Sequence, residues 1–237
     1  VTPEDMMQRF GKIITEVNKL IVRMVPEEFK KEWMVDAQAG TVAFGSAYHN
    51  WATSLPFMAK KNVNFKQIYE FMEKEQRREL AQAAPLHEVL LDMIVEKLPS
   101  ADAAQKYRIP HIWRGESEED IGQAMVNANA NGDSAFMVTK VVLDPHAGEI
   151  AVGRLFSGTI KKGDQMYVAG MPNANRVQSV GMFVGGDRIA TENVTAGNII
   201  AVSGLRDAQS GSTISSNKDM TPFERIVHNS DPVVTTA

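Results

Sequence analysis

The sequence predicts two structural halves, a mostly helical first half with few strands and an all-β second half. In the first half, apolar residues recur at helical spacing, which predicts a helix with one buried face formed by Phe10, Ile13, Ile14, Val17, Leu20 and Ile21. In the second half, short β-type runs alternate with glycine turns at a spacing of about ten residues. This spacing is typical of a closed barrel or a sandwich.

The composition is that of an ordinary globular protein, with 237 residues of which 43% are hydrophobic and 23% are charged. The chain has no cysteine, which excludes disulfides and thiolate chemistry and fits a reducing cytoplasm. No apolar run reaches the roughly 20 residues of a membrane helix, so we expect no membrane association and no signal peptide. The net charge of -4 argues against a uniformly basic nucleic-acid binder, although it leaves room for a local basic patch.

The first helix is predicted to begin at Thr2, which suits a cap position, with Pro3 at the first helical position. Pro26 marks its end or a break. Further helices are predicted over Phe65–Leu80 and from Pro85 to Leu98. The stretch from Ser100 to Gly132 is irregular and acidic in part, and we interpret it as a connection between domains.

A short buried strand over Thr41–Phe44 is followed by the small-residue turn Gly45-Ser46-Ala47. A helix over Tyr48–Met58 is predicted to begin from this turn. A strand, a tight turn and a helix start together present free backbone N–H groups, which suit a polar ligand. On the pattern alone, an ordinary strand–helix connection is the favoured interpretation.

The glycine spacing of Gly148–Asp164 superficially resembles a phosphate-binding loop. Such a loop needs a lysine and then Ser or Thr after its second glycine, with a helix starting there. Arg154 and Leu155 occupy those positions, and another β-type run follows. We therefore predict a β-hairpin instead, within a set of strands over Ala135–Leu143, Ile150–Ser157, Thr159–Ile160, Gln165–Ala169, Arg176–Val184 and Ile199–Ser203, with a last strand from Ile214.

No catalytic or metal-binding constellation is legible in the sequence. The histidines are widely spread, and none has the spacing of a helical zinc site. The dipeptides Asn18-Lys19 and Asn217-Lys218 lack the aspartate that a guanine-recognition motif requires. Positive charges gather in the β half, where they contact a polyanion or simply lie in solvated turns: Arg154, Lys161, Lys162, Arg176, Arg188 and Arg206.

Several of these stretches resemble the elongation factor 2 family in its archaeal form and, more distantly, elongation factor G and other translational GTPases. The resemblance rests on Pro3–Val22, on Thr41–Ala47, on Leu98-Pro99-Ser100 and on Gly148–Asp164. It covers essentially the whole chain, which resembles an internal segment of the family. The last of the four patterns is widespread in the second domain of translational GTPases.

The resemblance implies an α/β remnant of a GTPase domain followed by a Greek-key-type barrel. Residues 1–114 would be the C-terminal part of the GTP-binding domain, 115–132 a linker, 133–222 the barrel and 223–237 the start of a further domain. Gly45, Ser46 and Ala47 would form the family's last guanine-contact loop. The phosphate loop, the switch segments and the Asn-Lys-x-Asp motif are missing, so we expect no catalytic residue, no metal site and no activity in this chain alone. GTP and magnesium would belong to the intact family member.

The resemblance also implies a partner, the ribosome. In the intact protein the barrel would dock on small-subunit ribosomal RNA during GTP-dependent translocation in the cytoplasm, with Arg154, Lys161 and Lys162 as candidate contacts. Self-association through the first half is expected if its sheet is incomplete. The alternatives are a stand-alone ribosome- or RNA-binding module, or part of another translational GTPase such as a release or initiation factor.

Overall fold

The structure, a computed structural model, describes residues 3–116, 118–145 and 147–225. The chain divides into two compact units, Val1–Leu98 and Pro99–Ala237, which are described one at a time. This division falls earlier than the boundary expected after residue 114. The expected cap residue Thr2 and nearly all of the expected start of a further domain lie outside the described residues.

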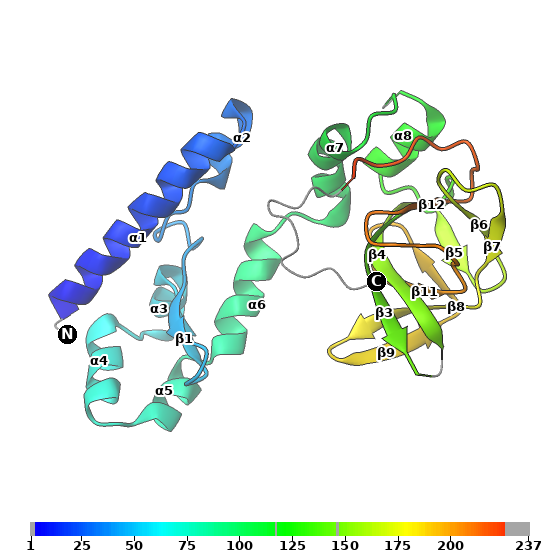
Figure 1. The fold of residues 1–237 in the computed structure, drawn as a ribbon. Helices are drawn as coiled ribbons and strands as arrows, with labels where there is room; N and C mark the ends of the chain where they lie inside the picture. Colours follow the sequence, from blue (N-terminus) through cyan, green and yellow to red (C-terminus); the bar gives the residue numbers. More distant parts are fainter. Residues whose placement is uncertain (1–2, 117, 146, 226–237) are drawn as a thin grey trace, which may run out of the picture. The chain divides into compact units, whose positions relative to one another are not determined.

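Helices dominate the first unit and surround one small hairpin (Figure 1). Its elements are α1 Pro3–Met24, α2 Glu27–Trp33, β1 Phe44–Ser46, β2 Trp51–Thr53, α3 Leu55–Lys61, α4 Phe65–Glu73, α5 Arg77–Ala83 and α6 Leu86–Lys97. A single core cluster joins the hairpin to α3, α4, α5 and α6, with Ala52, Phe57, Met58, Ile68, Leu80, Ala84 and Val89 buried.

The predicted helix α1 forms, but the prediction that one of its faces is buried is wrong for the described structure. Ile13, Val17 and Leu20 are 47%, 38% and 54% exposed. Phe10 contacts the ring of Phe44, with 4.7 Å between the ring centroids. Helical periodicity correctly predicted that the apolar residues of α1 lie on one face. Only part of that face packs against other described elements.

Two local predictions in this unit are also wrong. No helix starts at Tyr48, because the chain turns back there to form β2, and α3 begins only at Leu55. The helix predicted over 65–80 is broken between α4 and α5, where Glu75 has a positive φ of 55°. Both breaks depend on backbone conformations that side-chain periodicity does not encode.

The second unit opens with two helices where the sequence predicts an irregular connection. These are α7 Ala101–Ile112 and α8 Asp120–Val126. Gln105 of α7 is buried, and its Nε2 donates to the carbonyls of Met125 and Phe156. This amide ties both helices to the sheet, and Ile109, Trp113, Ile121, Met125, Phe156 and Phe223 form a core cluster around it.

The strands of the second unit lie together in Figure 1. Eight of them form an antiparallel sheet in the order β7-β6-β12-β3-β4-β11-β8-β9, and β10 pairs separately with β5. Their bounds are β3 Ala135–Asp144, β4 Gly148–Ser157, β5 Thr159–Lys161, β6 Gln165–Val168, β7 Ala174–Arg176, β8 Ser179–Val184, β9 Asp187–Thr191, β10 Asn193–Thr195, β11 Ile199–Ser203 and β12 Thr213–Ser215. Strands within Gly148–Asp164 are thus confirmed, but the predicted hairpin is wrong, since β4 pairs with β3 and β11 whereas β5 pairs with β10. The strand predicted over 176–184 is interrupted between β7 and β8.

Glycine at position 153 permits close contact between strands. A Cβ there would lie 1.9 Å from the carbonyl oxygen of Met137 on β3. The largest core cluster lies on one side of these strands and includes Phe136, Leu155, Ile160, Ile200 and Ile214, all at most 1% exposed. The second unit therefore has a large, well-buried main core.

Candidate functional site

Gly45, Ser46 and Ala47 lie together at one end of the β1–β2 hairpin. Gly45 is in register with Ala52, and Ser46 is in register with Trp51. Ala47 is exposed and opens the turn that joins the two strands. The structure thus keeps the three predicted residues adjacent but places two of them in a strand instead of a turn that leads into a helix.

The turn after Ser46 is held by local hydrogen bonds. The carbonyl of Ala47 accepts from the N–H of Asn50 at 3.1 Å, and Ser46 Oγ accepts from the N–H of His49 at 3.3 Å. Asn50 has a φ of 55°, which an asparagine tolerates better than most residues. An exposed turn of this kind can offer a few backbone groups to a ligand, but it does not enclose one.

Gly45 also has a structural reason to be glycine. A Cβ at this position would lie 2.5 Å from the carbonyl oxygen of Trp51 and 2.8 Å from the Cα of Ala52. The hairpin is then fixed to the α5–α6 junction, because Ala52 N–H donates to the carbonyl of Ala84 at 3.0 Å. The close approach of β1 and β2 therefore explains this glycine without any ligand.

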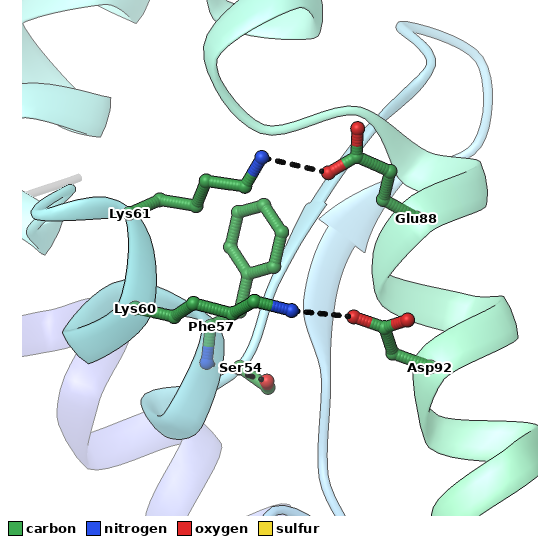
Figure 2. Close-up of polar contacts among 6 residues, drawn as sticks. All are labelled: Ser54, Phe57, Lys60, Lys61, Glu88 and Asp92. Atoms are coloured by element: carbon green, nitrogen blue, oxygen red, sulfur yellow. Dashed lines mark hydrogen bonds and ion pairs between the residues drawn. The ribbon is translucent and has the colours of Figure 1, made fainter.

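The helix start that follows the hairpin is occupied by protein contacts (Figure 2). Ser54 Oγ caps α3 by accepting from the N–H of Phe57 at 3.3 Å. Lys60 and Lys61 of α3 pair with Asp92 and Glu88 of α6, at 3.6 Å and 3.1 Å. These contacts fix α3 against α6.

The cavity between α3 and α6 is too small for a nucleotide. Its volume is about 60 Å³, and its lining includes Gly40, Ser54, Phe57 and Asp92. A cavity of this size holds a few water molecules at most. The hairpin and α3 therefore supply at most part of a nucleotide site.

Arg154 lies on β4, in register with Met137 of β3 and Ile199 of β11. Its side chain is partly buried, and its Nε has no hydrogen-bond partner among the described residues. Burial, and secondarily the charge of Arg108 on α7, lowers the pKa of Arg154. A partly buried cation beside a like charge is a position that favours an anion.

Lys161 and Lys162 have different surroundings from those of Arg154. They are exposed at the end of β5, where the N–H of Lys161 donates to Asp164 Oδ2 at 2.9 Å. The position that a Cβ would take on Gly163 lies 3.9 Å from a guanidinium nitrogen of Arg176. This turn therefore gathers basic side chains from two strands in an exposed position.

Arg188 belongs to a polar cluster that the sequence alone does not select. Its guanidinium donates to Ser179 Oγ, and this oxygen lies 2.6 Å from Ser203 Oγ. Arg188 Nε is buried and has no hydrogen-bond partner among the described residues. The three residues come from β9, β8 and β11, so only the strand register brings them together. In the sequence, the only signal was an arginine after a double-glycine turn.

Comparison with known proteins identifies the second unit first. Residues 148–215 match the family of elongation factor Tu domain 2. The matched region contains Arg154, Lys161, Lys162 and Arg188. It also contains the strands from β4 to β12.

The whole chain is similar to elongation factor 2 proteins. It is 54% identical to elongation factor 2 of Picrophilus torridus over 234 residues, which are 99% of this chain and 32% of that protein. It is 53% identical to elongation factor 2 of Thermococcus gammatolerans over 99% of the chain, and 52% identical to that of Pyrococcus horikoshii over 100%, in each case with 32% of the relative covered.

The chain spans about one third of the length of the curated elongation factor 2 proteins that it matches. Within the described residues, no group of three or more His, Asp or Glu side chains is placed to hold a metal ion. None of the described helices is long and apolar enough to cross a membrane.

Proposed function

We propose that this chain is part of a GTP-dependent ribosomal translocase of translation elongation, acting in the cytoplasm. The observation that carries the proposal is the identity of 52–54% to three archaeal elongation factor 2 proteins over essentially the whole chain. Such identity over both units favours this function over a stand-alone RNA-binding module. It also favours elongation factor 2 over a release or initiation factor.

The first unit would be the C-terminal part of a GTP-binding domain, an α/β remnant in this chain. Gly45, Ser46 and Ala47 would contact the guanine base through backbone N–H groups from the hairpin tip. The exposure of Ala47 at the turn is compatible with this role. GTP and magnesium would be held mainly by segments that this chain does not include.

The second unit would be the docking domain, a Greek-key-type barrel. Its match to elongation factor Tu domain 2 supports this assignment. Arg154, Lys161 and Lys162 would neutralise phosphates of small-subunit ribosomal RNA. The exposed position of the two lysines and the unpartnered Nε of Arg154 are compatible with such contacts.

A chimera tests the proposal directly. The corresponding third of Thermococcus gammatolerans elongation factor 2 is replaced by this chain, and GTP-dependent translocation is measured on archaeal ribosomes. We expect the chimera to translocate. A chimera that folds and binds GTP but fails to bind ribosomes would contradict the proposal.

A matched variant of the chimera tests the three cations. Replacing Arg154, Lys161 and Lys162 with alanine is expected to weaken ribosome binding and to flatten its salt dependence, since each lost phosphate contact removes counterion release. Arg225, which is exposed on the same unit, gives the control when it is replaced with alanine. If the loss of ribosome affinity per removed charge is the same in the triple variant and in the control, these three residues are not part of the contact surface.

The isolated chain is expected to show no detectable GTP binding in titration calorimetry. One base-contacting turn cannot replace the phosphate loop and the magnesium ion, which supply most of the contacts to the nucleotide in this class. The intact relative serves as the positive control under the same conditions. Micromolar affinity of the isolated chain for GTP would contradict this expectation.

A further inference from the structure

The segment that connects α8 to β3 contains Asn131 followed directly by Gly132. Among the asparagines of the sequence, only Asn131 precedes a glycine. The backbone nitrogen of the residue after an asparagine can attack the side-chain amide carbon of that asparagine. Glycine hinders this attack least, because it has no Cβ and the freest backbone. The pair is therefore the first place to look for deamidation, provided that the fold leaves it free to react.

The structure leaves both reacting groups of this pair available. Asn131 is exposed in a turn outside the helices and strands. Its backbone N–H donates to Asn129 Oδ1 at 2.9 Å, but its side-chain amide makes no hydrogen bond to another described residue. The attacking nitrogen, that of Gly132, lies 3.5 Å from the carbonyl oxygen of Asn129, which is beyond the roughly 2.7–3.2 Å of an ordinary N–H···O bond. No strong hydrogen bond therefore holds either group away from the reaction.

Packing explains why the second residue of the pair is glycine. A Cβ at Gly132 would lie 2.6 Å from the Cβ of Ala124 on α8. A larger residue at this position would push α8 and the turn apart, which costs stability in a packed structure. The fold thus keeps an unhindered nitrogen next to Asn131 for a reason that is unrelated to the reaction.

We propose that Asn131 is a site of spontaneous deamidation and isoaspartate formation in the folded chain. The nitrogen of Gly132 bonds to Cγ of Asn131, the bond from Cγ to Nδ2 breaks, and the proton of the Gly132 nitrogen leaves with the amide group as ammonia. Water then opens the cyclic succinimide. Opening at Cγ gives aspartate, opening at the backbone carbonyl carbon gives isoaspartate, and neither route needs an oxidant or a reductant. The inference goes beyond the proposed function and does not depend on it.

The turn is anchored to strands on both sides of the reacting bond. Before it, the carbonyl of Asn129 accepts from the N–H of Gly158 at 2.8 Å. After it, the carbonyl of Asp133 accepts from Ser157 Oγ at 2.6 Å. An isoaspartyl residue leads the backbone through the side-chain CH₂ and so adds an atom between these two anchors. Isoaspartate is therefore expected to loosen the anchors, whereas aspartate leaves the length of the backbone unchanged.

Ageing of the folded 237-residue chain in a mildly alkaline buffer tests the proposal. Peptide mass spectrometry detects the exchange of NH₂ for OH at each asparagine, and labelling by an isoaspartate methyltransferase detects the isoaspartyl product. We expect Asn131 to convert before Asn173, which is also exposed but precedes an alanine. Conversion should be faster at higher pH, because the Gly132 nitrogen must lose its proton. Equal rates at Asn131 and Asn173, or no isoaspartate at Asn131, would overturn the proposal.

An unfolded sample and one variant control this experiment. The chain unfolded in urea should convert at Asn131, which shows that the product is detected. If only the unfolded chain converts, the native turn protects Asn131 and the proposal fails. Asn131→Gln should abolish the isoaspartate signal, because the longer side chain would have to close a larger ring. A signal that persists in this variant would place the reaction at another residue and overturn the assignment.

A second variant separates the new charge from the longer backbone. Asn131→Asp carries the charge of the product without the added atom. We expect the Gly158 amide, followed by NMR hydrogen exchange, to exchange faster in the isoaspartate-enriched chain than in Asn131→Asp, which should match the fresh chain. Equal exchange in the enriched chain and in Asn131→Asp would show that the turn tolerates the longer backbone, and would overturn the expected loss of the anchors.

Discussion

The two units of this chain differ in how completely they bury their own apolar side chains. The second unit has a main cluster of fifteen buried residues, whereas the cluster of the first unit has seven. In the first unit, large side chains of α1 and α6 remain exposed, including Leu20 at 54%, Leu91 at 57% and Val95 at 82%. Contiguous exposed apolar side chains mark surfaces that other protein covers. The second unit therefore has the core of an independent domain, and the first unit has surfaces suited to further contacts.

The largest expected effect is a difference in stability loss between one core substitution in the second unit and one surface substitution in the first. Phe136→Ala removes a side chain that is 0% exposed, and we expect it to destabilise the second unit by about 3–5 kcal/mol. Leu20→Ala removes a side chain that is 54% exposed and should change the stability of the first unit by no more than about 0.5 kcal/mol. Hydrogen exchange resolved to peptides measures each unit separately. A loss of more than 2 kcal/mol from Leu20→Ala, or similar effects in both units, would contradict the comparison.

The next effect concerns the hairpin that carries the candidate guanine loop. Gly45→Ala places a Cβ against the backbone of β2, and we expect a loss of about 1–3 kcal/mol in the first unit. Ser46→Ala removes one 3.3 Å hydrogen bond at an accessible turn and should cost less than about 1 kcal/mol. Hydrogen exchange of the β2 amides distinguishes the two variants. A stable Gly45→Ala variant would mean that the close approach does not explain this glycine.

A comparison of the same hairpin with the strands of the second unit explains which predictions succeeded. Apolar β-type residues and glycine turns predicted most strands of the second unit. Residues such as Val152 and Leu155 are apolar because they are buried, so their burial can be predicted from residue type alone. The reversal at 47–50 depends on a positive φ at Asn50 and on hydrogen bonds to distant residues, such as that from Ala52 to Ala84, 32 positions away. Local pattern does not contain such contacts.

The candidate site shows the same limit. The sequence could select Arg154, Lys161 and Lys162 as cations in a β-rich stretch, but it could not tell their surroundings apart. Arg154 is partly buried beside α7, whereas the lysines are exposed in a turn. Arg188 stands out only in the structure, where the pairing of β8, β9 and β11 brings it next to Ser179 and Ser203. Residue type is local information, but the partners of a charge are set by strand register.

A smaller effect is expected from the exposed face of α1. We propose that this face supports weak self-association of the isolated chain, because Ile13, Val17 and Leu20 form an exposed apolar stripe. Replacing Ile13 and Leu20 with lysine is expected to weaken the association about tenfold, or ~1.4 kcal/mol. Sedimentation equilibrium over a range of concentrations measures this change. The conservative substitutions Lys12→Arg and Lys19→Arg, at two exposed positions of the same helix, serve as controls. A chain that is monomeric at every concentration would contradict the proposal.

The smallest effect is expected from the ion pairs between α3 and α6. Lys61 and Glu88 lie 3.1 Å apart, but each side chain is 43% exposed, so solvent screens the attraction. A double-mutant cycle with alanine at both positions should give a coupling energy of about 0.2–1 kcal/mol at low salt, falling as salt is added. Lys60 and Asp92, which are farther apart at 3.6 Å and more exposed, should couple more weakly still.

Because Phe57, Met58 and Val89 are buried between the same two helices, apolar packing should hold α3 on α6 after both pairs are removed. Detachment of α3 in the doubly unpaired variant, seen as rapid exchange of its amides, would reverse this ranking of the two contributions.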